Sequence, residues 1–204
     1  IFEFVNKVLY EDGEYYSYQL IEKIRKHWLS SSSKLKVVDL GAGSKKFKTN
    51  DRKIKDICRI SVQPKKYGQL LFRIVNYFQP ENIIELGTSL GITTAYLASA
   101  AKHSTVFSIE GDPQTYTIAQ KTIRLSKLEN VKLINESFKN SLPEVLDSIE
   151  KVDLVFIDGH HEKNATINYF DNCLKKSHDG TVFIFDDINW TDGMKQAWMI
   201  IKDN

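Results

Sequence analysis

The chain has 204 residues, enough for one domain with an appendage, and its 42% hydrophobic and 26% charged residues are ordinary for a globular protein. A net charge of only +2 argues against a nucleic-acid or membrane partner, and apolar runs no longer than a strand exclude a membrane-spanning helix. The two cysteines, Cys58 and Cys173, form no paired pattern, which excludes a disulfide scaffold or a zinc finger and favours a reducing, cytoplasmic location.

Residues 1–64 form an N-terminal extension ahead of the regular part of the chain. Apolar side chains recur every three or four positions over residues 15–29, which is the period of an amphipathic helix. Four serines separate this helix from an extended segment at 34–40, and a basic stretch without periodicity follows at 45–55. We expect the extension to be a spacer or a lid that selects the substrate.

Strands and helices alternate over residues 65–204, which we expect to form the main domain. The expected helices cover residues 67–78, 93–101, 113–125, 142–148, 165–175 and 193–202. The expected strands cover residues 82–86, 105–110, 131–135, 152–158 and 180–186. This alternation predicts an α/β fold with a Rossmann-like, doubly wound and mostly parallel sheet. Such a sheet binds its ligand at the carboxyl ends of its strands.

The first expected strand ends in a glycine-rich turn that begins with a carboxylate. Gly87 and Gly91 allow the backbone to turn sharply and to approach a ligand closely. A dinucleotide site prefers G-x-G-x-x-G, whereas this turn reads E-x-G-x-x-x-G, and Glu85 would repel a pyrophosphate but suits a cationic ligand. Glu110, 19 residues after Gly91, is placed to accept hydrogen bonds from ribose hydroxyls. The alternative is a tight strand–helix turn without a ligand.

These strand-end residues occur in the order and spacing of class I S-adenosylmethionine-dependent methyltransferases. From residue 67 to about residue 198, the chain resembles the small O-methyltransferases of the catechol and caffeoyl-coenzyme A type. The matching stretches are 68–71, 85–91, Glu110, 135–137, Asp158 and 186–187. The resemblance implies S-adenosyl-L-methionine as cofactor and a small-molecule acceptor. It implies these cofactor-binding residues: Glu85, Gly87, Thr88, Ser89, Gly91 and Thr93 for the methionine part, Glu110 and Gly111 for the ribose, Ser137 and Phe138 for the adenine, and Asp158 near the amino group.

Three aspartates after the fourth and fifth strands are candidate metal ligands. The relatives named above hold a divalent cation with one aspartate after the fourth strand and an Asp-Asn pair after the fifth. This chain has Asp158, Asp186 and Asp187 at these positions. Oxygen ligands suit Mg²⁺ or Mn²⁺, and three neighbouring carboxylates would repel one another without a cation. The alternative is that Asp187 caps the following turn and that Asp186 hydrogen-bonds to the backbone.

The candidate base departs from the family pattern. Catechol-type enzymes place a lysine three residues after the first aspartate, whereas His161 stands there in this chain. A histidine titrates near neutral pH and can accept the proton of a substrate hydroxyl, directly or assisted by a metal at Asp158. His160 competes with His161 as base or metal ligand, and the alternative is that both are loop residues without a role. The acceptor therefore stays open among phenolic, sugar and natural-product hydroxyls.

A second glycine turn, at residues 39–44, also fits a cofactor motif, D-x-G-x-G. No acidic strand end follows it about 20 residues later, so we reject it as the main site. We expect either a plain turn or a loop that folds over the active site. In the second case Lys45, Lys46, Arg52 and Lys53 would contact an anionic substrate.

Two other functions stay open from the sequence. An NAD-dependent oxidoreductase is disfavoured by the missing G-x-G-x-x-G, whereas a non-catalytic domain that binds the cofactor or a partner would share the fold. Class I methyltransferases end with two further strands, the last antiparallel, which we expect to be missing after Asn204. Without these strands the sheet would have an exposed edge, which a homodimer could cover instead.

Overall fold

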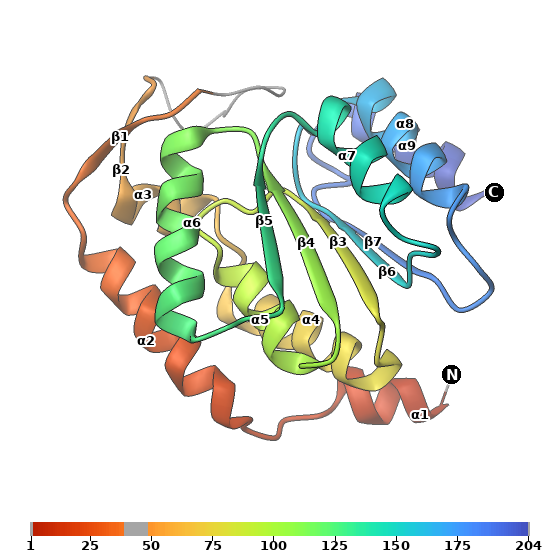
Figure 1. The fold of residues 1–204 in the computed structure, drawn as a ribbon, viewed down its shortest axis with the longest axis horizontal. Helices are drawn as coiled ribbons and strands as arrows, with labels where there is room; N and C mark the ends of the chain where they lie inside the picture. Colours follow the sequence, from red (N-terminus) through yellow and green to blue (C-terminus); the bar gives the residue numbers. More distant parts are fainter. Residues whose placement is uncertain (1, 39–48, 204) are drawn as a thin grey trace.

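A sheet of five parallel strands forms the centre of the computed structural model, which describes residues 2–38 and 49–203 (Figure 1). The strands are β3 (Asn82–Leu86), β4 (Thr105–Glu110), β5 (Val131–Asn135), β6 (Leu154–Ile157) and β7 (Val182–Phe185). Their order across the sheet is β5-β4-β3-β6-β7, so the direction of winding reverses between β3 and β6. The prediction of a doubly wound α/β fold is confirmed. This reversal is also the point at which such sheets bind their ligands.

Helices cover both faces of this sheet (Figure 1). One face carries α4 (Lys65–Phe78), α5 (Ile92–Ala100) and α6 (Pro113–Ser126), and the other carries α7 (Phe138–Asp147), α8 (Lys163–Leu174) and α9 (Asp192–Lys202). Successive strand residues alternate between the layers, because Ile83 packs with α4 and α5 whereas Ile84 packs with α7. Burial of both faces explains why the strands are continuous apolar runs. Among the helices of the described residues, none is long and apolar enough to cross a membrane.

The N-terminal region shares its core with the sheet domain. Its elements are α1 (Phe2–Phe4), the π-helix η1 (Val5–Leu9), α2 (Tyr16–Ser30), β1 (Lys34–Lys36), β2 (Asp51–Lys53) and α3 (Ile54–Ile60). The buried residues of α2 are those that the helical period predicts, namely Tyr18, Ile21, Ile24, Arg25 and Trp28. The apolar ones join a single cluster with Tyr96 of α5 and Ile118 of α6. The described part of region 1–64 therefore packs on the domain and reaches its ligand-binding end.

Two local predictions are corrected by the structure. The basic stretch expected to be irregular contains β2, whose Lys53 lies opposite Lys34 of β1, and the first residues of α3. No local period predicts this pairing, because the paired residues are far apart in the sequence, as Lys36 and Asp51 are. Helix α7 begins at Phe138, four residues earlier than predicted, with Ser137 as its extended N-cap residue. The glycine turn at 39–44, together with Lys45 and Lys46, lies outside the described residues.

Candidate active site

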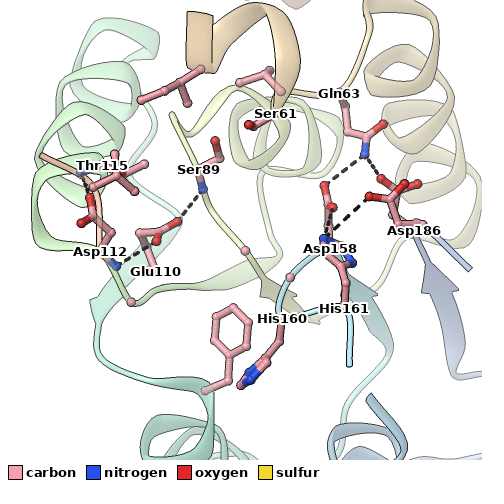
Figure 2. Close-up of a pocket in the computed structure, with 18 of the residues that line it drawn as sticks. Ser61, Gln63, Ser89, Glu110, Asp112, Thr115, Asp158, His160, His161 and Asp186 are labelled. Atoms are coloured by element: carbon pink, nitrogen blue, oxygen red, sulfur yellow. Dashed lines mark hydrogen bonds and ion pairs between the residues drawn. The ribbon is translucent and has the colours of Figure 1, made fainter. Parts of the chain in front are cut away.

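A cavity of about 690 Å³ opens at the carboxyl ends of the parallel strands (Figure 2). The turn after every strand contributes to its wall. These residues include Ser89 after β3, Gly111 after β4, Phe138 after β5, Asp158 after β6 and Asp186 after β7, and Glu110, the last residue of β4, lies beside them. The α3–α4 region closes another side with Ile57 and residues 60–64. The cavity therefore joins all the strand ends to the N-terminal region.

The glycine turn after β3 lies directly against the end of β6. Gly87 has a φ of +110°, and a Cβ atom there would overlap the carbonyl oxygen of Asp158 and lie 2.8 Å from its carbonyl carbon. Only glycine therefore permits this contact between two turns at the switch point. Gly91 also has a positive φ, +77°, but a Cβ there would lie 3.1 Å from the Cα of Ala119 in α6. Gly91 thus serves helix packing and does not line the cavity.

Glu110 ties the ends of β3 and β4 together at the cavity wall. Its carboxylate accepts the backbone N–H of Ser89 at 2.8 Å and that of Asp112 at 2.9 Å. Burial raises the pKa of Glu110 to about 7, while these backbone hydrogen bonds act in the opposite direction. Each carboxylate oxygen keeps a second lone pair. Glu110 is therefore a rigidly held acceptor that faces the space between the two strand ends.

Glu85 lies behind the cavity wall, in the sheet itself. Its side chain is 0% exposed, and one carboxylate oxygen accepts hydrogen bonds from the hydroxyls of Thr94 and Ser108. The other oxygen has no hydrogen-bond partner within the described residues, and burial raises the pKa of this carboxyl to about 7. A buried acceptor without a partner is costly in free energy unless a ligand donor or a cation approaches it. Thr88 and Thr93, also expected to bind the cofactor, do not line the cavity either.

Gln63 bridges two of the three predicted metal-binding aspartates (Figure 2). Its side-chain amide donates to Asp158 at 3.0 Å and also to Asp186. Burial first, and then the negative charge of Asp186, hold the pKa of Asp158 well above its usual range, while the Gln63 hydrogen bond opposes them. The carboxylate of Asp186 therefore pairs with the side chain of Gln63. One alternative from the sequence expected it to hydrogen-bond to the backbone.

The structure brings His161 together with Asp158 and Asp187. The Nε2 atom of His161 lies 4.0 Å from Asp158 Oδ1 and 3.8 Å from Asp187 Oδ2. The three residues each offer one ligand atom within 4.8 Å of the others, a spacing that a metal ion can span. Among the described residues, the group with ligand spacing shares Asp158 and Asp187 with the predicted set, and the prediction of Asp186 as a metal ligand stays a prediction. His161 takes the place of Asp186 in the group with ligand spacing.

His160 points away from these carboxylates. Its Nδ1 atom lies 2.8 Å from the hydroxyl of Tyr169 in α8, and its Nε2 lies 3.7 Å from Glu162. His160, His161 and Asp187 all have positive φ values, of 70°, 45° and 52°. Such conformations cost free energy in residues with a Cβ and concentrate at functional sites. Of the two candidate bases, the geometry thus favours His161.

Several residues of the wall were missed by the sequence analysis. Gln63, Asp112, Tyr169 and Trp190 all line the cavity. Asp112 caps α6 by accepting the backbone N–H of Thr115, and an aspartate directly before a proline is a recognisable helix start. The other three belong to no motif, and only the fold brings them to the site.

Comparisons with known proteins agree on one family. A family profile described as a methyltransferase domain matches residues 84–188. A catechol O-methyltransferase of Niastella koreensis is 31% identical over 132 residues, which covers 63% of this chain and 58% of that protein. The transmembrane O-methyltransferase of Homo sapiens is 35% identical over 79 residues, covering 37% of this chain and 27% of that protein. The chain thus spans less than two thirds of these relatives.

Solved structures show the same fold at low sequence identity. An O-methyltransferase from Bacillus cereus, in complex with S-adenosylhomocysteine, superposes with a TM-score of 0.66 at 21% identity over 99% of this chain and 84% of that chain. The O-methyltransferase TomG from Streptomyces achromogenes, in complex with S-adenosylmethionine, gives a TM-score of 0.65 at 17% identity over 97% and 82%. The family profile covers 105 of the 204 residues, including the carboxyl ends of all five strands that form the cavity. The chain therefore belongs to the methyltransferase domain family.

Proposed function

We propose that this chain is an S-adenosylmethionine-dependent O-methyltransferase that acts on the hydroxyl of a small molecule. One observation carries the proposal: a single cavity holds both the Glu110 acceptor beside the glycine turn and the group of Asp158, His161 and Asp187. The first half suits a nucleoside with a cationic tail, and the second suits a hydroxyl that must lose a proton. The names of the relatives in the preceding section point to the same reaction.

The cofactor half of the proposal uses residues that the structure holds rigidly. Glu110 would accept the ribose hydroxyls, because its two oxygens are already oriented by backbone N–H groups. Ser137 and Phe138 would border the adenine. Glu85 lies behind the cavity wall and would not touch the cofactor, but a positive charge bound in the cavity would partly offset the cost of burying its carboxylate. The cofactor would supply an electrophilic methyl group carried on positive sulfur.

The acceptor half centres on His161. Its imidazole would take the proton of the acceptor hydroxyl, while Asp158 and Asp187 would stabilise the imidazolium that forms. The acceptor oxygen would then form a bond to the methyl carbon as the bond from carbon to sulfur breaks. The products are the methyl ether, S-adenosylhomocysteine and the proton held on His161. Positioning of the two reactants in one cavity would supply much of the rate enhancement.

A divalent cation is a finer part of this proposal. Asp158, Asp187 and His161 would hold it, and it would acidify the acceptor hydroxyl. An imidazole among the ligands widens the choice from Mg²⁺ to Mn²⁺ and other transition metals. In that case His161 orients the acceptor and does not take its proton. A cytoplasmic location and a homodimer remain predictions from the sequence.

The test is methyl transfer to a diol in which phenolic hydroxyls are adjacent. The protein is incubated with S-adenosylmethionine and 3,4-dihydroxybenzoate, with and without Mg²⁺, Mn²⁺ or a chelator, and the methylated product is measured by mass spectrometry. We expect product formation by the unaltered chain and a loss of about 100-fold or more in kcat for His161→Ala. His160→Ala is the matched control, because His160 faces Tyr169, and it should retain most of the activity. Equal losses in the two variants would contradict the role given to His161.

A further inference from the structure

The segment from Ser61 to Pro64 joins α3 to α4 and forms one wall of the cavity. Within it, the side-chain amide of Gln63 donates to two carboxylates of the site, those of Asp158 and Asp186. The two carboxylates carry like charges, so the amide between them offsets their repulsion. Whatever fixes the main chain at Gln63 therefore also fixes these two side chains.

A buried arginine of the N-terminal region holds that main chain. Arg25 of α2 donates through Nη1 to the carbonyl oxygen of Gln63 at 2.8 Å. The side chain of Arg25 is only 9% exposed. Burying a guanidinium costs free energy, and an apolar residue would fill this position of an amphipathic helix more cheaply. The contact with the Gln63 carbonyl supplies a reason for a charged residue on the buried face of α2.

Two further side chains orient the guanidinium. Glu22, one turn earlier in α2, accepts from Arg25 Nε at 2.8 Å and from the hydroxyl of Tyr96 at 2.8 Å. Tyr96 belongs to α5, the helix that follows the glycine turn, and is fully buried. A Cβ on Gly68 of α4 would lie 2.6 Å from the Tyr96 ring, so the ring is packed tightly against α4. The network is thus anchored on helices α4 and α5, which are part of the sheet domain.

We propose that Arg25 is a positioning residue, which through the main chain of Gln63 places the Gln63 amide between Asp158 and Asp186 and so makes the N-terminal region part of the acceptor site. This rests on the proposed methyltransferase function. Loss of Arg25 frees the segment at residues 61–64, and the two carboxylates then separate. Asp158 is in the same turn as His161, so the acceptor is misaligned. The cofactor half, built from Ser89 and Glu110, does not depend on this network.

The first measurement needs no acceptor and tests the anchoring itself. Hydrogen–deuterium exchange is followed at the backbone amides of residues 61–63 in the unaltered chain, Arg25→Met and Gln63→Met. We expect Arg25→Met to accelerate exchange in this segment about tenfold or more, and Gln63→Met to leave it nearly unchanged, since Arg25 binds the main chain. Arg73→Met is the matched control, because Arg73 Nε also donates to a distant N-terminal carbonyl, that of Val8 at 2.7 Å, outside the site. Unchanged exchange in Arg25→Met overturns the proposal.

The second measurement separates positioning from a purely structural role. Kinetics with 3,4-dihydroxybenzoate are measured alongside the Kd for S-adenosylhomocysteine. We expect Arg25→Met and Gln63→Met each to lower kcat/KM for the acceptor about tenfold, with the Kd changed less than about threefold. The double variant should be no worse than either single one, whereas multiplied losses would mean that Arg25 acts independently of Gln63 and would overturn the proposal.

Two further measurements separate a failure of the Arg25 proposal from misfolding of Arg25→Met and from a failure of the proposed function. Arg25→Lys keeps the charge beside Glu22 but has one ammonium in place of the guanidinium fork, so it should show the same effects to a smaller extent. If Arg25→Met does not fold, Arg25→Lys and Gln63→Met decide the question. If the unaltered chain binds no S-adenosylhomocysteine, the proposed function fails, and the exchange measurement still decides whether Arg25 holds residues 61–64.

Discussion

The contact between Gly87 and the end of β6 leads to a quantitative prediction for Gly87→Ala. An alanine at a φ of +110° is strained by about 1–3 kcal/mol. Its Cβ would also overlap the backbone of Asp158, which no side-chain rotation can relieve, and such overpacking costs about 1–3 kcal/mol. The two contributions together predict a loss of about 4 kcal/mol in the free energy of unfolding. Since Gly87 belongs to the glycine turn of the cofactor half and lines the cavity, binding of S-adenosylhomocysteine and activity should fall as well.

Urea denaturation followed by circular dichroism measures this loss. Gly193→Ala is the control, because Gly193 lies within α9 and the nearest atom to an added Cβ, that of Lys163, would be 3.5 Å away. Alanine is the better helix former, so this variant should be unchanged or more stable by up to about 1 kcal/mol. A loss below about 1 kcal/mol in Gly87→Ala would refute the account of a glycine-only contact at the switch point.

Three further predictions concern buried polar groups. Burial raises the pKa of Glu85 from 4.5 to about 7, so the folded chain holds this proton more tightly and its stability falls as the pH rises from about 4.5 to 7; Glu85→Gln should remove this fall in melting temperature. Burial alone would raise the pKa of Asp153, but hydrogen bonds, including that from His178, prevail and lower it below 3.8. The resulting stability is present above pH 3.8 and is lost as the pH falls further, so Asp153→Asn should cost about 2 kcal/mol at pH 7 and flatten the acid limb of the unfolding curve. Thr122→Val leaves Trp28 Nε1 without its acceptor and should cost about 2 kcal/mol in urea denaturation.

Exposed residues of the same type provide the controls. Thr117 lies on the same helix as Thr122 but is exposed. Thr117→Val should therefore change the free energy of unfolding by less than about 0.5 kcal/mol. Glu150→Gln is the control for Glu85→Gln and Asp171→Asn is the control for Asp153→Asn, since Glu150 and Asp171 are exposed. A buried variant that behaves like its exposed control would contradict the role assigned to that buried group.

The central sheet could be predicted from the sequence almost to the residue. Strands β3, β4 and β5 coincide with the predicted ranges. For β3 and β4 the reason is that a strand buried on both faces is an apolar run bounded by turn residues. The hairpin of β1 and β2 could not be predicted, since both strands are three residues long and carry mainly charged side chains. Their pairing depends on the core beneath them, which no local window contains.

The site likewise contains residues that the sequence predicts and residues that only the fold brings there. The positions of Ser89, Glu110 and Asp158 at the strand ends follow from the alternation of strands and helices, and all three line the cavity. The direction of a side chain does not follow, and Glu85 faces Thr94 and Ser108 behind the wall. Gln63 lies 95 residues from Asp158 in the sequence and belongs to no motif. Only the packing of α2 and α3 on the domain brings it to the carboxylates.

The central claim is that the cavity binds S-adenosylmethionine through Glu110 and the glycine turn. Calorimetric titration of the unaltered chain with S-adenosylhomocysteine tests it most directly, with NAD⁺ as the competing ligand and Glu110→Ala as the variant. The account predicts micromolar binding of S-adenosylhomocysteine, a loss of about tenfold or more in Glu110→Ala, and no binding of NAD⁺. Binding of NAD⁺ alone, or S-adenosylhomocysteine binding that is unchanged in Glu110→Ala, would contradict it.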